Sequence, residues 1–295
     1  MDIRQLEYFL AIVDSGGFNR AASALYVSQP SLSQAVRTLE RDLGSDLFHR
    51  IGRRVVLTEA GRALIEPARA AVRSLETARA SVASVHELRT GRLDVASMPS
   101  QAVEPLTTLI SAFSDRHPGV VVTVKAVFTA RDVTEAVRTG TVELGLLATA
   151  GPLPCTEVAT LDLGRQRFVL LVPPGDPFGG RGSLTSEELS GRRLIVGQPG
   201  TGMRAYVDSL RDQGVAFSVA AEIEHRVAVL PLVLAGLGLA VVTDSWRDLA
   251  WRAGAHVLDI EPATALHIGL VSRRGPVSPA AAAFLATASA TAAPA

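Results

Sequence analysis

Residues 18–40 read FNRAASALYVSQPSLSQAVRTLE, and this stretch decides the fold of the N-terminal part of the chain. Apolar residues at positions 18, 21, 22 and 25 share one helix face, which predicts a short helix. Ser28 then offers an N-cap and Pro30 suits a first helical turn, so a second helix is expected to begin there. Its inward side carries Leu32, Val36 and Leu39, with Ala35 beside them. Two short helices joined by a tight turn form a helix-turn-helix.

The second helix of this motif has a polar outward face. Short donors and acceptors at the N-terminal end of a recognition helix are placed to meet the edges of bases. The residues predicted on this face are Gln29, Ser31, Ser33, Gln34 and Arg37.

A small hairpin is predicted directly after the two helices. Residues 47–58 read LFHRIGRRVVLT, with two β-prone runs on either side of Gly52. Arg50, Arg53 and Arg54 gather at the tip of this hairpin. They could be a solvated charged turn, but beside a helix-turn-helix they favour a wing that touches the DNA backbone or minor groove.

One long helix is predicted over residues 58–89, with Thr58 as its N-cap. Apolar residues follow at alternating spacings of four and three, which is a heptad seam. Such a helix could pack on the rest of its own chain. However, we expect no partner within its own small domain and therefore favour a dimerising linker. The seam consists of Leu64, Ala68, Ala71, Leu75, Ala78, Val82 and Val85.

Strands and helices alternate from Gly91 onward. This alternation predicts parallel sheets in two α/β units, with a ligand cleft between them. The predicted strands are 93–96, 120–127, 143–148, 167–172, 194–197, 217–223, 239–243 and 266–271. Helices are predicted within 99–117, over 131–139, 201–213 and 227–235, and from about residue 278.

The net charge of zero would by itself argue against a nucleic-acid binder, because 29 basic residues balance 29 acidic ones. The balance is uneven along the chain. Residues 1–62 hold eight arginines against seven acids, whereas residues 91–295 hold 17 basic against 19 acidic residues. The whole-chain sum therefore hides a slight basic excess in the predicted helix-turn-helix region.

Cys155 is the single cysteine, so no disulfide within the chain and no cysteine metal cluster can form. The first ten residues lack the pattern of a signal peptide. The longest apolar run, 227–242, is too short for a membrane span and is interrupted by proline and glycine. We therefore expect a cytoplasmic protein with no membrane partner.

The sequence contains no convincing motif for catalysis, cofactor binding or metal binding. We therefore expect no catalytic residue, no cofactor and no metal. The run Gly200–Ala205 fits the dinucleotide pattern GxGxxA, and Glu222 follows about 20 residues later. However, Pro199 stiffens this turn, and the motif lies deep in the chain. Helix starts after Ser97, Thr129 and Thr201 could bind a small anion, or could be ordinary caps.

Several motifs in the first 61 residues resemble the winged helix-turn-helix of LysR-type transcriptional regulators. They are FNRAA at 18–22, VSQPSLS at 27–33, LE at 39–40, LG at 43–44, LFHR at 47–50 and LTEAG at 57–61. The second half is similar too, through His117-Pro118, AGLG at 235–238 and the order of its strands and helices.

The resemblance implies three parts. These are a DNA-binding domain over 1–58, a dimerising linker helix over 59–89 and an effector-binding domain over 90–295 with a periplasmic-binding-protein-like fold. Its subdomain I would cover about 90–162 and 266–295, and its subdomain II about 163–265. The implied partners are promoter DNA, a small anionic effector, further copies of the chain as a dimer of dimers, and RNA polymerase. The alternative is a small-molecule-binding protein or an enzyme on the same α/β scaffold, which would have no use for the helix-turn-helix.

The resemblance also carries over residue by residue. Gln34 stands where many members have Arg, Met98-Pro99 after the first strand is unusual, and the single cysteine excludes a peroxide sensor of this family. The residues expected at DNA are Arg20, Ser28, Gln29, Pro30, Ser31, Ser33, Gln34, Arg37, Arg50, Arg53 and Arg54. Those expected at the effector are Ser97, Met98, Pro99, Ser100, Thr129, Gly200, Thr201, Gly202, His225 and Arg226.

Overall fold

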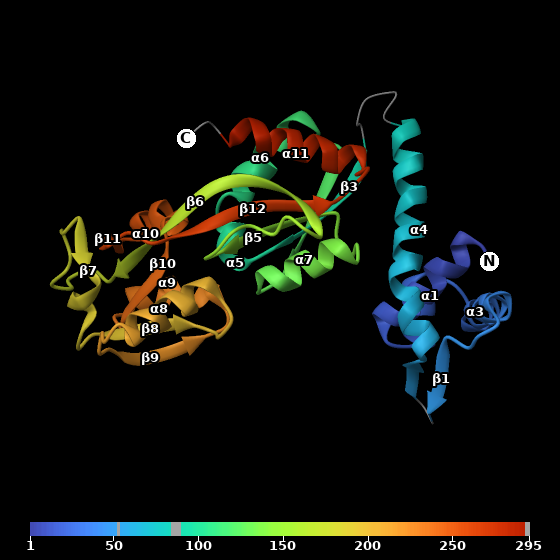
Figure 1. Cartoon of the computed structure of the whole chain (residues 1–295), viewed down its shortest axis with the longest axis horizontal. Coiled ribbons are helices and arrows are strands. Elements are labelled where there is room, and N and C mark those ends of the chain that lie inside the picture. Colours follow the sequence, from blue (N-terminus) through green and yellow to red (C-terminus); the bar gives the residue numbers. More distant parts are fainter. Residues whose placement is uncertain (52–53, 84–89, 293–295) are drawn as a thin grey trace. The chain divides into compact units, whose positions relative to one another are not determined.

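A computed structural model of the chain describes residues 1–51, 54–83 and 90–292 (Figure 1). The chain divides into two compact units, Met1–Glu87 with Thr139–Thr141 and Leu88–Arg138 with Val142–Ala295. Within the described ranges, no helix has both the length and the apolar character needed to cross a bilayer.

The N-terminal unit contains the predicted helix-turn-helix and hairpin. Helix α3 (Gln29–Leu43) begins where Ser28 Oγ accepts the N–H of Ser31 at 3.2 Å, so the predicted cap is confirmed. The predicted cap Thr58 is confirmed in the same way, because its Oγ1 accepts the N–H of Gly61 at 2.8 Å. The elements are α1 Ile3–Ser15, α2 Phe18–Ala24, α3 Gln29–Leu43, β1 Phe48–Ile51, β2 Arg54–Leu57 and α4 Glu59–Ala83.

Phe48, the first residue of the hairpin, joins the two apolar clusters of this unit. Its ring centroid lies 5.4 Å from that of Phe9 in α1 and 5.5 Å from that of Phe18 in α2. Ring pairs at this separation add to the stability that burial of their area provides. Phe48 therefore anchors the hairpin to the helices, together with Val55 and Leu57 of the second hairpin strand.

The linker helix α4 does have a partner within its own unit, so the opposite expectation was wrong. Ala68 is 1% exposed, and Leu64 and Ala71 pack against the cluster that contains Leu6 and Phe9 of α1. The heptad pattern marks an apolar stripe but does not specify what covers it, and here α1 covers its first half. Further along the seam, Leu75 is half-buried and Ala78 exposed. The side chain of Val82 and the whole of Val85 lie outside the described residues.

The second unit begins with a parallel arrangement of strands. β3 (Gly91–Ser97) pairs in parallel with both β4 (Val120–Ala126) and β5 (Leu144–Thr149). Helices α6 and α11 lie together on one face of this part of the sheet, and α7 lies on the other (Figure 1). The helices of this half are α5 Pro99–Val103, α6 Leu106–Arg116, α7 Ala130–Arg138 and α11 Pro279–Thr291.

Two long strands, β6 (Val158–Val172) and β12 (Ala265–Arg273), connect the halves of the second unit. The chain leaves the first half along β6 and returns along β12, so the two strands run in opposite directions. The strand order is β4-β3-β5-β12-β6-β10-β8-β9, with β11 beside β6 and β7 beside β11. The remaining elements are β7 Ser183–Thr185, η2 Ser186–Leu189, β8 Arg193–Gly197, α8 Gly202–Asp212, β9 Ser218–Ile223, η3 Arg226–Ala228, α9 Val229–Leu234, β10 Leu239–Thr243, η4 Asp244–Trp246, α10 Arg247–Arg252 and β11 His256–Glu261.

The α/β class is confirmed. The expected parallel pairing holds for β3 with β4 and β5 and for β8 with β9 and β10, but the sheet as a whole is mixed. β12 pairs antiparallel with β5 and β6, and β6 pairs antiparallel with β10 and β11. The strand predicted over 167–172 is only the end of β6. Its first part escaped prediction because Asp162, Gly164 and Arg165 interrupt the apolar pattern where one side faces solvent. The short elements β7, β11 and α10 were also missed, and the helix expected within 99–117 is two helices that meet at Pro105.

Candidate nucleic-acid interface and effector site

The N-terminal turn of α3 presents a small polar surface. Ser28 and Ser31 are exposed, and their hydroxyl oxygens lie 2.7 Å apart. Pro30 and Gln34 are exposed as well, and so is Arg37 one turn further on. These side chains are available to a duplex that approaches the N-terminal end of α3, as the sequence predicts.

Ser33 differs from this expectation, because its side chain is buried at 9% exposure. Its hydroxyl accepts a hydrogen bond from Gln29 Nε2 at 2.7 Å, across one turn of α3. Placing Ser33 on the outward face was therefore wrong. The four-residue spacing from Gln29 makes it a support for the Gln29 amide, while Gln29 itself stays partly exposed.

Two other groups of predicted DNA-binding residues are placed differently. Arg20 is exposed, and its Nη2 donates to the carbonyl of Gly16 at 2.8 Å, where α1 ends. Arg50 and Arg54 lie on the paired strands β1 and β2, so the predicted hairpin is confirmed in the backbone. Their side chains, and Arg53 entirely, lie outside the described residues.

Three of the predicted effector residues are fixed by their own hydrogen bonds. Ser97 is 1% exposed and donates to the carbonyl of Met98 at 3.0 Å, so its hydroxyl is engaged locally. Thr129 caps α7 by accepting the N–H of Asp132 at 3.1 Å. Thr201 caps α8 by accepting the N–H of Arg204 at 3.4 Å, and it donates to the carbonyl of Gln198 at 3.0 Å.

A cluster around Met203 brings together predicted effector residues from both halves of the unit. Arg226 Nη1 donates to Met203 Sδ at 2.9 Å, and Ser100 Oγ lies 3.9 Å from the same sulfur. Ser100 comes from α5 in the first half, whereas Met203 and Arg226 come from the second half. Met203 was not among the predicted effector residues. Its position in the first turn of α8, two residues after the cap Thr201, could have indicated it. His225 beside Arg226 is exposed and does not join the cluster.

Glycines allow close approach around this cluster. A Cβ on Gly197, at the end of β8, would lie 3.2 Å from Arg226 Nη2 and 3.4 Å from Thr201 Oγ1. Gly200 has φ +83°, and a Cβ there would lie 3.9 Å from the methyl group of Thr129. A side chain at Gly197 would crowd the guanidinium, so the glycine lets Arg226 pack closely against the end of β8.

The dinucleotide pattern at 200–205 finds no support in the structure. The acid that such a site needs for the ribose, Glu222, accepts from Arg204 Nη1 at 2.8 Å. Arg204 also binds Asp208, with Nε 2.9 Å from Oδ1. Glu222 is thus held in an ion-pair network. No group of three residues suited to hold a metal occurs within the described part of the chain.

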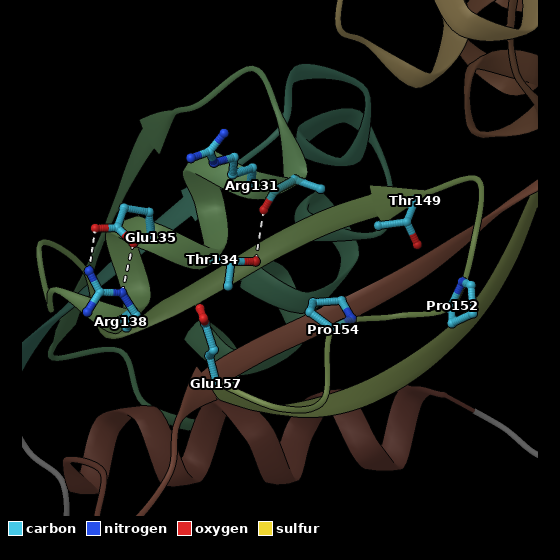
Figure 2. A pocket seen from close by; sticks show the side chains of 9 residues that line it. Arg131, Thr134, Glu135, Arg138, Thr149, Pro152, Pro154 and Glu157 are labelled. Atoms are coloured by element: carbon cyan, nitrogen blue, oxygen red, sulfur yellow. Dashed lines mark hydrogen bonds and ion pairs between the residues drawn. The ribbon is translucent and has the colours of Figure 1, made fainter.

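A separate open hollow of about 510 Å³ lies between α7 and the segment that precedes β6 (Figure 2). Arg131, Glu135, Arg138 and Glu157 line it, together with Ala130, Thr134, Thr149, Pro152 and Pro154. Arg138 Nη2 lies 2.7 Å from Glu135 Oε1, and this contact lowers the pKa of Glu135. Two arginines balance two glutamates, and no predicted effector residue lines the hollow, so it does not resemble a selective anion site.

Two regions of the chain match protein families whose function is known. Residues 3–62 match the bacterial regulatory helix-turn-helix proteins of the lysR family, and residues 86–293 match the LysR substrate binding domain. The chain belongs to the LysR family. It is a DNA-binding transcriptional regulator with a substrate-binding domain, which decides against the enzyme alternative.

Curated relatives of this LysR-family regulator extend over nearly its whole length. The RuBisCO operon transcriptional regulator of Allochromatium vinosum is 30% identical over 288 residues, which cover 96% of this chain and 94% of the relative. The transcriptional regulator IlvR of Caulobacter vibrioides is 29% identical over 287 residues, 95% of this chain and 94% of the relative.

Solved structures share the fold of this LysR-family chain. Full-length OxyR from Pseudomonas aeruginosa has a TM-score of 0.76 at 21% identity, covering 99% of this chain and 94% of OxyR. CbnR solved in complex with its target DNA has a TM-score of 0.70 at 23% identity, covering 99% of this chain and all of CbnR. The expected combination of a winged helix-turn-helix with a C-terminal α/β domain is therefore confirmed.

Proposed function

We propose that this LysR-family regulator binds promoter DNA in the cytoplasm as a homo-oligomer, and that a small anion bound at Arg226 controls that binding. The observation that carries the proposal is the environment of Arg226. Its side chain is 9% exposed, and within the described residues the guanidinium has no carboxylate partner. The partner it does have is the thioether of Met203, which is a weak acceptor without charge.

The charge of Arg226 persists despite its burial. Removal from water lowers the pKa of the guanidinium to about 10, so it still carries a proton at neutral pH. An uncompensated buried charge costs on the order of several kcal/mol. A bound anion offsets this cost, and a carboxylate matches the planar fork of a guanidinium with two parallel hydrogen bonds.

The surroundings of Arg226 favour a small ligand with polar groups. Thr201 Oγ1 and Arg226 Nη2 would both lie within 3.4 Å of a Cβ at Gly197, which places them around one point. Ser100 adds a buried hydroxyl from the first half of the unit. We propose small carboxylates as the effector class. Among the predicted effector residues, Ser100 and Arg226 are those we keep as direct contacts, because Thr201 donates its hydroxyl proton to the carbonyl of Gln198.

Because the cluster draws on both halves of the second unit, an anion there would bias their arrangement. Ser100 of the first half contacts Met203 of the second half. The next residue after Ser100, Gln101, donates from Nε2 to Gln166 Oε1 at 3.1 Å. A ligand shifts such an equilibrium only by binding one arrangement more tightly than the other. We propose that this shift changes how the subunits present their helix-turn-helix units to DNA.

We propose base contacts from Gln29, Ser31 and Gln34, and contacts to the DNA backbone from the arginines of the hairpin.

Edge strands support assembly into an oligomer. Val121 on β4 is 64% exposed and Val219 on β9 is 43% exposed, and an unpaired edge with exposed valines is suited to pack against another copy. A dimer of dimers, with RNA polymerase as a further partner, is the assembly we propose.

The experiment that tests the effector class is a thermal-shift screen of small carboxylates with the full-length protein. Each carboxylate is compared with its neutral amide. At a hundredfold excess over Kd, a carboxylate that binds should raise the unfolding midpoint by about 5 °C or more. Arg226→Met should abolish this shift, while Arg181→Met, which removes an exposed ion pair with Glu188, should preserve it. A shift of equal size in Arg226→Met would contradict the proposed site.

A further inference from the structure

Tyr26, in the turn between α2 and α3, combines two unfavourable features. Its backbone adopts the left-handed region with φ +54°, and it is the one non-glycine residue among the described residues with a positive φ. Its side chain is 97% exposed, so the ring is not stabilised by packing. A non-glycine residue in this conformation is strained, and such strain persists where it serves a function.

The same unit shows what the turn would ordinarily contain. Helix α1 ends at Gly16 with φ +65°, and α3 ends at Gly44 with φ +67°. At each end, the next residue donates back to the helix: Gly17 N–H to the carbonyl of Ile12 at 3.1 Å, and Ser45 N–H to that of Glu40 at 3.1 Å. These are Schellman motifs, in which glycine is the usual residue at the left-handed position.

Helix α2 ends in the same motif with Tyr26 in the glycine position. Tyr26 N–H donates to the carbonyl of Ser23 at 3.3 Å, and Val27 N–H donates to that of Ala22 at 3.0 Å. The geometry therefore does not require a tyrosine, and the two sister helices show that glycine satisfies it. Neither the backbone geometry nor the packing of this turn explains the tyrosine.

The position of Tyr26 suggests what the side chain does. It lies two residues before Ser28, the cap of the helix whose first two turns carry the exposed Ser31 and Gln34. When such a helix enters the major groove, the turn that precedes it lies beside a phosphate strand. Tyrosine hydroxyls are among the groups that bind phosphate and fix the register of a protein on DNA.

We infer that Tyr26 is a positioning residue whose phenol hydroxyl donates to a DNA phosphate next to the recognition helix. The inference rests on DNA binding by the helix-turn-helix and is independent of the effector. Because the phenol is uncharged, its contact releases no counterion, and this distinguishes Tyr26 from an arginine of the hairpin.

The test uses the full-length protein, a labelled duplex selected from a random pool by the wild type, and a scrambled duplex. Tyr26→Phe and Tyr26→Gly should each weaken binding to both duplexes by about tenfold, with the salt dependence unchanged. Tyr26→Gly should also raise the unfolding midpoint of the N-terminal unit by several degrees, because it removes the strain, whereas Tyr26→Phe should leave it unchanged.

The outcomes separate this inference from the proposed function. If the wild type selects no duplex, DNA recognition itself fails, and the contact at Tyr26 fails with it. If the wild type binds and Tyr26→Phe binds equally well, the hydroxyl contact is overturned while DNA recognition stands. Loss of affinity in Tyr26→Phe that accompanies a lower unfolding midpoint would also overturn it, since that is the signature of a structural role.

Discussion

Gln29 donates a hydrogen bond to Ser33 across one turn of α3, with Nε2 and Oγ 2.7 Å apart. Ser33 is buried, so it can hold the Gln29 amide in one orientation while Gln29 remains accessible. A fixed amide is better placed to bind a base with both of its polar atoms, as glutamine does with adenine.

Ser33→Ala should therefore reduce sequence discrimination. We expect a loss of about 1 kcal/mol at the selected duplex and little change at a scrambled one, because only the orientation of Gln29 is affected. Fluorescence anisotropy with both duplexes measures the two affinities. Thr38→Ala is the matched control, since it removes from the same helix a hydroxyl that bonds only the backbone carbonyl of Gln34 and does not touch Gln29. Equal losses on both duplexes in Ser33→Ala would contradict the supporting role.

The hairpin arginines should act through phosphate rather than through bases. Arg53→Ala combined with Arg54→Ala should weaken binding to selected and scrambled duplexes alike. It should also flatten the plot of log K against log salt by about 0.9 for each lost phosphate contact. Titrations at several salt concentrations give this slope. A loss confined to the selected duplex would show that these residues read sequence, and the wing assignment would then be wrong.

Substitutions in the two halves of the α4 seam should separate folding from assembly. Ala71 packs on the core of its own unit, so Ala71→Glu should lower the free energy of unfolding of that unit by about 1 kcal/mol or more. Ala78 is exposed, so Ala78→Glu should leave this free energy unchanged and weaken association of subunits. Chemical denaturation and sedimentation velocity measure the two effects. Unchanged association in Ala78→Glu would remove the second half of the seam from the dimerisation surface that the sequence predicts.

Local patterns predicted the elements whose signals are local. Ser28 and Thr58 cap helices where the sequence placed them, because a cap depends on side chains within three residues. The strand-to-helix junction at Thr201 was equally legible. These caps and periodicities were sufficient to place the helix-turn-helix and most of the strands.

Burial and contacts that involve residues far apart in the sequence could not be predicted from local patterns. A stripe on α4 looked like a subunit seam, yet α1 covers its first half. Ser33 looked exposed by periodicity, but it is buried where its hydroxyl supports Gln29. The sequence predicted Arg226 only as one of several residues at the effector. The proposed anion site depends on its burial beside Met203, which lies 23 positions earlier in the chain. Sequence spacing does not encode such tertiary contacts.

The most direct test of control by an anion at Arg226 is the affinity for the selected duplex, measured with and without a carboxylate that stabilises the wild type. Because linkage is reciprocal, a carboxylate that alters DNA binding must itself bind differently when DNA is present. We predict that the carboxylate changes the Kd for DNA of the wild type several-fold. Arg226→Met should bind the duplex with its affinity unaffected by the carboxylate. An Arg226→Met protein whose DNA affinity responds to the carboxylate as the wild type does would contradict the proposed mechanism.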